Sequence, residues 1–533
     1  MKKSPDRIDL AITGGLVCDG TAAVPYPADL GIWRGKIVAL GSLGEKKAYR
    51  TIDARGLVIA PGFIDIHGHT DEHILLYPRA ESKVHQGVTT EVAGNCGASP
   101  APLYGAALEE FNGEWSELSG SNASWRSCDD FFRLLEKKKI GINFAMLVGN
   151  GTIRGGVLGF DDRRAGPSEL VKMKAILSES LSTGAWGMSS GLIYVPSAFS
   201  SEDELISLAG LVKEAGGIYA THMRGEGDSL LESIAEALSV ALKSGVRLEI
   251  SHLKASGERN WKKLPQVLQM IEEARQMGGL VGADQYPYPA SSTGIASLFP
   301  SWVREGGKSA LLGNLEKEET CGRLAMEMND QVIDWTRIAF AAFKNEELLR
   351  FSGMRVGEAA HSEGKTPLEL VIRLIMMEKS DLPVLFFTQS EENVVAIMER
   401  PYVCFGTDAA ARSAEERRQE DMPHPRAYGT YPRILGHYVR DRSVLSLSDA
   451  VMKMTSLPAE RIGLTGRGRI REGWWADITV FDRTRIAEKS TYLDPHQYPE
   501  NIEYVIINGE VVIDQGTHTG ALPGRVLRRN AHE

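Results

Sequence analysis

Hydrophobic and polar positions follow a recurring order along residues 62–409. Eight short apolar runs, each flanked by glycine, proline or charged residues, are typical of buried strands. These runs cover residues 62–69, 87–96, 141–150, 185–194, 216–224, 246–254, 278–288 and 402–409. Between most of them lie amphipathic stretches with helical spacing, such as residues 201–216 and 229–245, which end in glycine. Eight strands that alternate with helices predict an α/β fold with a parallel sheet, closed as a TIM-type (β/α)8 barrel.

Two other parts of the chain do not fit this count. Residues from about 292 to 390 contain helical segments and one strand-like run between the seventh and eighth strands, so we expect an inserted lid segment there. Near both termini, four stretches alternate apolar and polar residues between glycine turns, which is typical of antiparallel strands with one solvated face. These stretches are residues 9–20, 29–41, 474–482 and 502–516. The sequence therefore predicts a small β-sandwich domain from residues 1–60 and 465–533, and a barrel domain at 61–464 that carries the insertion.

The composition favours a soluble protein that acts on small molecules. Of the 533 residues, 43% are hydrophobic and 24% are charged, so the chain can bury a sizeable core. The net charge of −10, without a long block of Lys or Arg, argues against nucleic acid or an anionic membrane as a partner. The first stretch, MKKSPDRIDLAITGG, lacks the apolar run of a secretory signal, and no segment approaches the roughly 20 apolar residues of a membrane span. Five scattered cysteines fit a reducing compartment, so we expect a cytoplasmic location; the oligomeric state stays open.

Side chains that can bind a metal ion follow five of the predicted strands. They are His67, His69, Cys96, His222, His252 and Asp408. Because the carboxyl ends of barrel strands lie on one rim, we expect all six to converge there. Imidazole, thiolate and carboxylate together favour Zn²⁺ over Mg²⁺ or Ca²⁺. Each residue taken singly also has a structural alternative, such as a histidine packed in the core or an aspartate that caps a helix.

Seven longer stretches carry a family resemblance. They are GLVIAPGFIDIHGHTD, GVTTEVAGNCG, SSGLIYVP, THMRGEG, ISHLKASG, DQYPYPASST and HPRAYGTYPRILGHYVR. Over nearly its full length the chain resembles the amidohydrolase superfamily and, within it, the N-acyl-D-amino-acid deacylases, also called D-aminoacylases. Many other members of the superfamily bridge two metals with a modified lysine on strand four. Here GAWGMSSG offers neither Lys nor Glu, while Cys96 is available on strand two, as in the deacylases.

The resemblance implies zinc-dependent hydrolysis of the amide bond of N-acyl-D-amino acids, with release of a carboxylic acid and a D-amino acid. It implies one tightly bound zinc ion on three residues and a second, weaker or empty position on three others. The first three are Cys96, His222 and His252, and the others are His67, His69 and Asp408. Asp408 would also be the catalytic base, which takes a proton from the attacking water and passes it to the leaving amine.

Substrate-binding residues are expected beside the metal. Lys254 lies two positions after a predicted ligand, where a cation is unusual unless an anion arrives. Arg426 could grip a carboxylate with its planar guanidinium, and Tyr286 and Ser291 could add hydroxyl donors. In the resembling family, residues matching these four hold the α-carboxylate of the D-amino acid. Tyr194 is expected to reach the scissile group.

The substrate side chain is predicted from the stretch after ASST. Members acting on acidic D-amino acids place an arginine a few residues further on, whereas this chain has GIASLFPSW, in which Leu298 and Phe299 predict an apolar pocket for neutral or hydrophobic D-amino acids. On strand three, Asn150 stands where the family has a histidine, which puts a nearby pocket contact in doubt. Two alternatives stay open: a cyclic-amide hydrolase of the hydantoinase or dihydroorotase kind, and a non-catalytic scaffold with the same fold.

Overall fold

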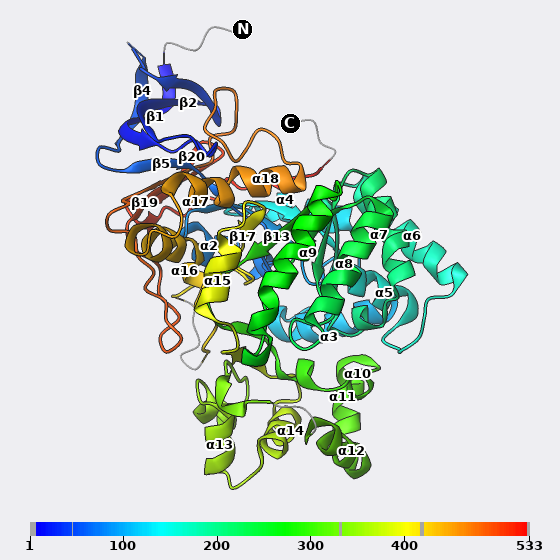
Figure 1. The fold of residues 1–533 in the computed structure, drawn as a ribbon. Helices are drawn as coiled ribbons and strands as arrows, with labels where there is room; N and C mark the ends of the chain where they lie inside the picture. The colour runs from blue at the N-terminus through cyan, green and yellow to red at the C-terminus, as the bar shows by residue number, and fades with distance from the viewer. Residues whose placement is uncertain (1–6, 45, 330–332, 416–420, 530–533) are drawn as a thin grey trace.

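The computed structural model describes four stretches of the chain: residues 7–44, 46–329, 333–415 and 421–529. The first six residues of the predicted N-terminal segment lie outside the described residues, as do residues 330–332 of the predicted insertion and the last four residues of the chain. Figure 1 shows strands from both termini at one end, a helix-covered barrel in the centre and the insertion at the opposite end.

Eight parallel strand positions build the barrel. They are β6 (Phe63–Asp65), β7 (Val88–Ala93), β8 (Asn143–Met146) with its continuation β9 (Val148–Gly149), β10 (Gly187–Gly191), β11 (Ile218–His222), β12 (Arg247–Ile250), β13 (Val281–Gln285) and β17 (Val403–Phe405). Strands β6 to β8 form one hydrogen-bonded sheet and β9 to β13 with β17 form another, and one residue separates β8 from β9. A parallel bridge between Gly68 and Ala409 joins the first strand region to the last. Each predicted strand region contains one of these positions, which confirms the predicted barrel.

Helices pack around these strands through regularly spaced apolar residues. Those that follow strands along the chain include α5 (Asn150–Leu158), α6 (Pro167–Ser182), α7 (Glu202–Glu214), α8 (Leu230–Ser244) and α9 (Leu264–Gln276). Helix α8 buries Ile234, Ala237 and Ala241, whose three- and four-residue spacing puts them on one face. It ends where Gly245 adopts the left-handed conformation, as the sequence predicts. The helices therefore fix the strands from outside and leave the carboxyl ends of the strands to carry the site.

The terminal strands form one nine-stranded sheet, which contains β1 (Arg7–Val17), β2 (Tyr26–Trp33), β3 (Lys36–Gly41), β4 (Lys47–Asp53), β5 (Val58–Pro61), β18 (Ile478–Phe481), β19 (Ile502–Ile507), β20 (Glu510–Asp514) and β21 (Thr517–His518). Its core includes Leu10, Ile32, Ile478 and Ile506 from both ends of the chain. Most neighbours are antiparallel, as expected, but β1 pairs in parallel with β4 and β5. The hairpin partner β2 occupies one edge of β1, so the chain crosses over and pairs with the other edge.

The insertion has a small core of its own. Its antiparallel sheet has the order β14 (Ser291–Gly294), β16 (Pro383–Phe386), β15 (Ile338–Phe340), so it contains three strands where the sequence predicts one. Its helices are α10 (Ser301–Arg304), α11 (Gly307–Leu315), α12 (Glu318–Asn329), α13 (Val356–Ser362) and α14 (Pro367–Glu378). They pack around an apolar cluster that includes Val303, Leu324, Phe340 and Leu370. Among the described helices, none is both long and apolar enough to cross a bilayer.

Candidate active site

Cys96 lies at the centre of the predicted metal-binding residues. Its Sγ atom is 3.4 Å from His67 Nε2, 3.7 Å from His222 Nδ1 and 3.5 Å from His252 Nε2. The loop after β7 therefore brings the thiol to the ends of the first, fifth and sixth strands of the barrel. The convergence that the sequence predicts is present in the structure.

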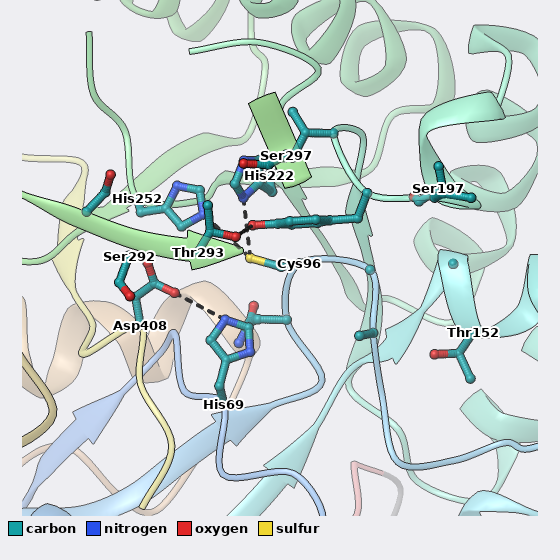
Figure 2. Close-up of a pocket in the computed structure, with 18 of the residues that line it drawn as sticks. His69, Cys96, Thr152, Ser197, His222, His252, Ser292, Thr293, Ser297 and Asp408 are labelled. Atoms are coloured by element: carbon teal, nitrogen blue, oxygen red, sulfur yellow. Dashed lines mark hydrogen bonds and ion pairs between the residues drawn. The ribbon is translucent and has the colours of Figure 1, made fainter. Parts of the chain in front are cut away.

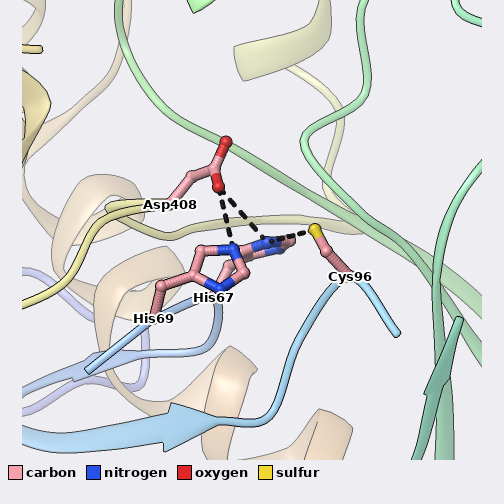
Figure 3. A group of neighbouring side chains, drawn as sticks. All are labelled: His67, His69, Cys96 and Asp408. Atoms are coloured by element: carbon pink, nitrogen blue, oxygen red, sulfur yellow. Dashed lines mark hydrogen bonds and ion pairs between the residues drawn. The ribbon is translucent and has the colours of Figure 1, made fainter. Parts of the chain in front are cut away.

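Asp408 completes a second group with His67, His69 and Cys96 (Figure 3). Its Oδ1 atom is 3.1 Å from His69 Nε2 and 3.6 Å from His67 Nε2. The potential ligand atoms form two overlapping sets, each within 4.8 Å: His67, His69, Cys96 and Asp408, and Cys96, His222 and His252. Cys96 belongs to both sets, whereas the sequence analysis assigns it to one.

These separations fit a tetrahedral ion. Ligands at zinc distances of 2.0–2.3 Å lie about 3.3–3.8 Å apart around a tetrahedron. Four of the measured separations, at 3.4–3.7 Å, lie in this range, and the separation between His69 and Asp408 is shorter, at 3.1 Å. The mixture of sulfur, imidazole nitrogen and carboxylate oxygen is also the donor set that zinc prefers over magnesium or calcium.

Three of these residues have a strained backbone. Cys96, His252 and Asp408 have φ angles of +52°, +36° and +49°, a left-handed region that non-glycine residues rarely adopt. Such conformations persist where the surrounding structure holds them and cluster at functional sites. Between the first two histidines, Gly68 is required, because a Cβ atom there would lie 2.0 Å from Glu91 Oε1.

The charges in this cluster reinforce one another. Burial by itself would raise the pKa of the Cys96 thiol, but the neighbouring His67 and His252 outweigh it and hold that pKa well below the usual 9.0. Burial likewise opposes ionisation of Asp408, while Arg426, His252 and His69 lower its pKa well below 3.8. Cys96 and Asp408 are therefore poised as anionic ligands at neutral pH.

Acidic residues behind the cluster orient the imidazoles, and the sequence analysis missed them. His67 Nδ1 lies 3.0 Å from Asp284 Oδ1, and the same carboxylate accepts a hydrogen bond from the His252 backbone N–H at 2.8 Å. His252 Nδ1 lies 3.0 Å from Glu226 Oε1. Such partners fix which ring nitrogen faces a metal. The signal for Asp284 is an acidic residue inside the otherwise apolar strand GLVGADQ.

A fully buried lysine ties the strands that carry the first and last ligands. Lys83 Nζ donates to Asp65 Oδ2 at 2.7 Å, to Thr407 Oγ1 at 2.7 Å and to the backbone oxygen of Ala409 at 2.8 Å. It also lies 3.2 Å from Glu91 Oε2. Thr407 and Ala409 are the neighbours of Asp408 in the chain. The contacts of Lys83 with them therefore fix the position of Asp408, the predicted catalytic base. The sequence analysis missed this group as well.

The predicted substrate-binding residues line one cavity of about 640 Å³. Figure 2 shows the part of this cavity around His69, Cys96 and Asp408. Its lining includes Tyr194, Lys254, Tyr286, Ser291 and Arg426, together with all the predicted ligands except His67, which is fully buried beneath. The structure thus brings the five predicted substrate-binding residues together with the predicted metal ligands. A cavity of this size lies in the range that encloses small organic ligands.

Several of the predicted anchors have partners inside the cavity. Lys254 Nζ donates to Glu226 Oε1 at 2.5 Å, and Arg426 Nη1 lies 2.7 Å from Asp408 Oδ2. The Tyr286 hydroxyl accepts a hydrogen bond from Gln389 at 3.1 Å, and the Tyr194 hydroxyl lies 2.8 Å from Thr293 Oγ1. The two cations therefore face carboxylates of the site in this structure.

Two expectations about the pocket lining need correction or refinement. Leu298 lines the cavity, but Phe299 does not, because its side chain is 2% exposed and packs in the apolar core of the insertion. Asn150 does not line the cavity either: its Oδ1 accepts hydrogen bonds from Ser197 and Ser200 at 2.7 and 3.1 Å. Asn150 thus connects α5 to the loop after β10 by hydrogen bonds. The next two residues, Gly151 and Thr152, line the cavity instead.

Comparison with known proteins places this site in a family. A model of the amidohydrolase family matches residues 50–285 and 394–513, and the stretch between them contains most of the insertion. A D-aminoacylase from Alcaligenes xylosoxydans xylosoxydans is 32% identical over 530 residues, which cover 98% of each chain. An N-acyl-D-glutamate deacylase from the same organism is 34% identical and covers 99% of this chain and 98% of its own.

Solved structures give the same placement. An N-acyl-D-glutamate deacylase from Bordetella bronchiseptica, complexed with zinc and a phosphonate inhibitor, has a TM-score of 0.83 at 31% identity and covers 98% of this chain and 100% of its own. A D-aminoacylase crystal structure has a TM-score of 0.82 at 32% identity with the same coverage. An L-hydantoinase from Arthrobacter aurescens, at 15% identity, shares the fold. With these matches and the ligand geometry, the chain belongs to the amidohydrolase family and, within it, to the N-acyl-D-amino-acid deacylases.

Proposed function

We propose that this protein uses zinc to hydrolyse the amide bond of N-acyl-D-amino acids, which releases a carboxylic acid and a D-amino acid. The observation that carries the proposal is one cavity in which five of the six potential ligands, with His67 buried beneath them, lie beside Lys254 and Arg426, two cations that suit a carboxylate. Full-length similarity to D-aminoacylases and N-acyl-D-glutamate deacylases supports it.

The metal would be held by residues whose geometry suits it. Cys96, His222 and His252 would hold the tighter ion, and His67, His69 and Asp408, sharing Cys96, would hold a second, weaker one. A solved D-aminoacylase is described as having a binuclear metal centre with one-metal activation and second-metal attenuation, which supports one essential ion. When bound, zinc supplies a Lewis acid for the carbonyl oxygen and lowers the pKa of a water to about 7.

Asp408 is the proposed catalytic base. Its low pKa keeps it ionised at neutral pH, so it can accept a proton from the attacking water and later donate it to the leaving amine. Arg426 lies against Oδ2, whereas Oδ1 faces the histidines. The guanidinium thus forms an ion pair with the carboxylate through Nη1 and has N–H donors left for the substrate.

The substrate carboxylate would bind among Lys254, Tyr286, Ser291 and Arg426. All four line the cavity, and the Lys254 and Arg426 cations lie 5.8 and 4.6 Å from the Tyr286 ring, which places both positive charges at one wall. Glu226, which pairs with Lys254 in this structure, would orient the ammonium group towards the substrate carboxylate. Tyr194, whose ring packs edge-on against His222 at 5.1 Å, would contact the scissile group.

We further propose a preference for neutral or hydrophobic D-amino acids. Leu298 and Phe386 give the cavity apolar surface on the side of the insertion. Arg304, the arginine that follows ASST, lines a neighbouring cavity and donates to the backbone oxygen of Ile193 at 2.7 Å, so it does not face the ligand cluster. The insertion would act as a lid over this side of the cavity.

We also propose a cytoplasmic location. The five cysteines are free in the described part of the chain, which is typical of a reducing compartment.

The alternatives fit the site less well. A cyclic-amide hydrolase would share the barrel, but the residues of β10 are glycine, methionine and serine, without the bridging lysine common in that group. A non-catalytic scaffold leaves unexplained three strained ligands that converge with lowered pKa values at two of them.

The decisive experiment is a substrate panel. Protein reconstituted with zinc should release amino acid from N-acetyl-D-leucine and N-acetyl-D-methionine far faster than from their L-enantiomers, N-acetyl-D-glutamate or hydantoins. Chelation should abolish the activity and added zinc should restore it. Ring opening without acyl release would favour the cyclic-amide hydrolase, and no hydrolysis of any member would refute the proposal.

A further inference from the structure

The cavity of the site has a polar side and an apolar side. Asp408 and Ser292 lie on one side of Cys96, and Thr152 and Ser197 lie on the other (Figure 2). The lining on the side of Thr152 contains the hydrocarbon side chains Leu103, Ala107, Phe111, Phe160 and Ile193, which we call the apolar arm. The carboxyl groups of Glu110 and Glu114 also line this part of the cavity.

The apolar arm runs along helix α3 (Gly105–Ser119) towards the surface. Exposure increases along this path: Leu103 and Ala107 are 1% and 9% exposed, Phe111 is half-buried and Glu114 is exposed. From Ala107 to Glu114 the helix axis advances about 10 Å, at 1.5 Å per residue. The arm is therefore a passage of substantial length and not a shallow recess beside the ligands.

The polar atoms along the arm already have partners. Thr152 Oγ1 accepts a hydrogen bond from the Ser99 N–H at 2.9 Å, and Ser197 Oγ donates to Asn150 Oδ1 at 2.7 Å. At the outer end, the carboxylate of Glu114 pairs with Lys308 Nζ at 3.3 Å. Burial, and then the charge of Glu114, raise the pKa of Glu110 to about 7. Apart from these two carboxyl groups, the arm thus offers mainly apolar contact.

We propose that the apolar arm binds the acyl group, and that the protein prefers unbranched acyl groups of medium length, such as octanoyl, to acetyl. This inference rests on the proposed function. With the α-carboxylate at Lys254 and Arg426 and the amide carbon beside Asp408, the acyl chain leaves the ligand cluster on the side opposite the carboxylate. A cavity of about 640 Å³ also has the size that suits a drug-sized molecule, more than an acetyl amino acid fills.

Burial of hydrocarbon sets the expected effect. Each methylene that leaves water contributes up to about 0.8 kcal/mol, or about fourfold in affinity. Because the outer part of the arm is open to solvent, the six added methylenes of octanoyl should gain less than this limit. We expect at least a tenfold higher kcat/KM for N-octanoyl-D-leucine than for N-acetyl-D-leucine.

The test compares the N-acetyl, N-butanoyl, N-hexanoyl and N-octanoyl amides of one amino acid, D-leucine, as substrates of the zinc-loaded protein. Ala107→Phe should fill the arm and lower the octanoyl-to-acetyl ratio of kcat/KM at least tenfold. Ala106→Phe, on the same helix but not among the residues that line the cavity, is the matched control and should keep the parent ratio. An acetyl preference, or a ratio that Ala107→Phe leaves unchanged, would overturn the inference.

A binding measurement separates this inference from the proposed function. Calorimetry on the metal-free protein compares octanoyl- and acetyl-D-leucine for the parent and for Ala107→Phe. One outcome is that no substrate is hydrolysed, but N-octanoyl-D-leucine binds more tightly than N-acetyl-D-leucine and Ala107→Phe removes the difference; this would support acyl binding in the apolar arm and refute the hydrolytic function. The other is that N-acetyl-D-leucine is hydrolysed and longer chains neither bind nor react better; this would support the hydrolytic function and refute acyl binding in the apolar arm.

Discussion

Removal of the buried cation at Lys83 is the perturbation whose result follows most directly from the structure. Lys83→Met keeps most of the volume of the side chain but leaves the carboxylates of Asp65 and Glu91 without their shared counter-ion, in a place where all three side chains are 0% exposed. Breaking a buried ion pair by removing one partner typically costs about 3–5 kcal/mol. We expect Lys83→Met to lose about that much stability.

This loss can be converted into a melting temperature. With an unfolding entropy of about 2.1 cal/mol/K per residue over a barrel of roughly 400 residues, 3–5 kcal/mol corresponds to a fall of about 4–6 °C. Lys243→Met is the matched control, because Lys243 forms an exposed ion pair with Glu202 at 2.8 Å, and such pairs contribute about 0–1 kcal/mol. The assay is thermal unfolding of metal-free protein, which keeps zinc affinity out of the comparison.

The pH dependence gives the experiment a second readout. Burial already raises the pKa of Glu91 above 4.5, against the lowering effect of Lys83, so removal of the lysine raises that pKa further. A carboxyl whose pKa is higher in the folded protein favours folding when protonated, and this contribution is lost as the pH rises above the unfolded value. The deficit of Lys83→Met should therefore be larger at pH 8 than at pH 5.5, and Lys83→Met/Glu91→Gln should recover part of it. A fall below 1 °C, equal at both pH values, would refute the role of the buried lysine.

Three further substitutions test the site itself. Cys96→Ser removes the sulfur shared by both ligand sets, so the amount of zinc that the protein retains after dialysis should fall more than tenfold, as measured by mass spectrometry. Full retention of zinc would show that the thiol is not a ligand. Asp408→Asn should lower kcat by about 10²–10⁴-fold in a single-turnover assay, and undiminished turnover with zinc bound would exclude it as the base. Lys254→Met should raise KM at least tenfold with a smaller change in kcat. Because this substitution leaves the Glu226 carboxylate without its partner, Lys254→Met/Glu226→Gln is the control. An unchanged KM in both variants would show that the substrate carboxylate binds elsewhere.

The ligand cluster could be predicted from the sequence because the carboxyl ends of all strands in a parallel barrel lie on the same rim. Once Cys96, His222, His252 and Asp408 are recognised as strand-end residues, the parallel arrangement places them on one rim. The same reasoning needs no knowledge of loop conformation. It therefore succeeds for side chains at strand ends, even though three of these residues have φ angles that no pattern of apolar residues predicts.

The orienting residues could not be found in this way. Asp284 is a single charged residue within an apolar run, and alternation indicates which side it faces but not what it contacts. Lys83 lies in the four-residue helix α2 (Glu81–Val84), two residues after another charged residue, so the sequence gives no sign that it is buried. Glu226 lies in a loop, where no periodicity applies. The sequence also could not separate Leu298 from Phe299 in the insertion. These neighbours are both apolar, but Leu298 lines the cavity and Phe299 packs in the core of the insertion.

The absence of a ligand on the fourth barrel strand follows from how Cys96 is held. The loop that carries Cys96 packs directly on β10: Ser189 Oγ accepts a hydrogen bond from the Gly97 N–H at 3.0 Å and donates to the Gly94 backbone oxygen at 2.5 Å. A Cβ atom at Gly191 would lie 2.0 Å from the Cys96 backbone oxygen. A long side chain on this strand would displace the loop, so a bridging lysine here and a thiolate at Cys96 are sterically exclusive. The small residues of β10 thus leave room for the loop that carries Cys96, as the proposed metal centre requires.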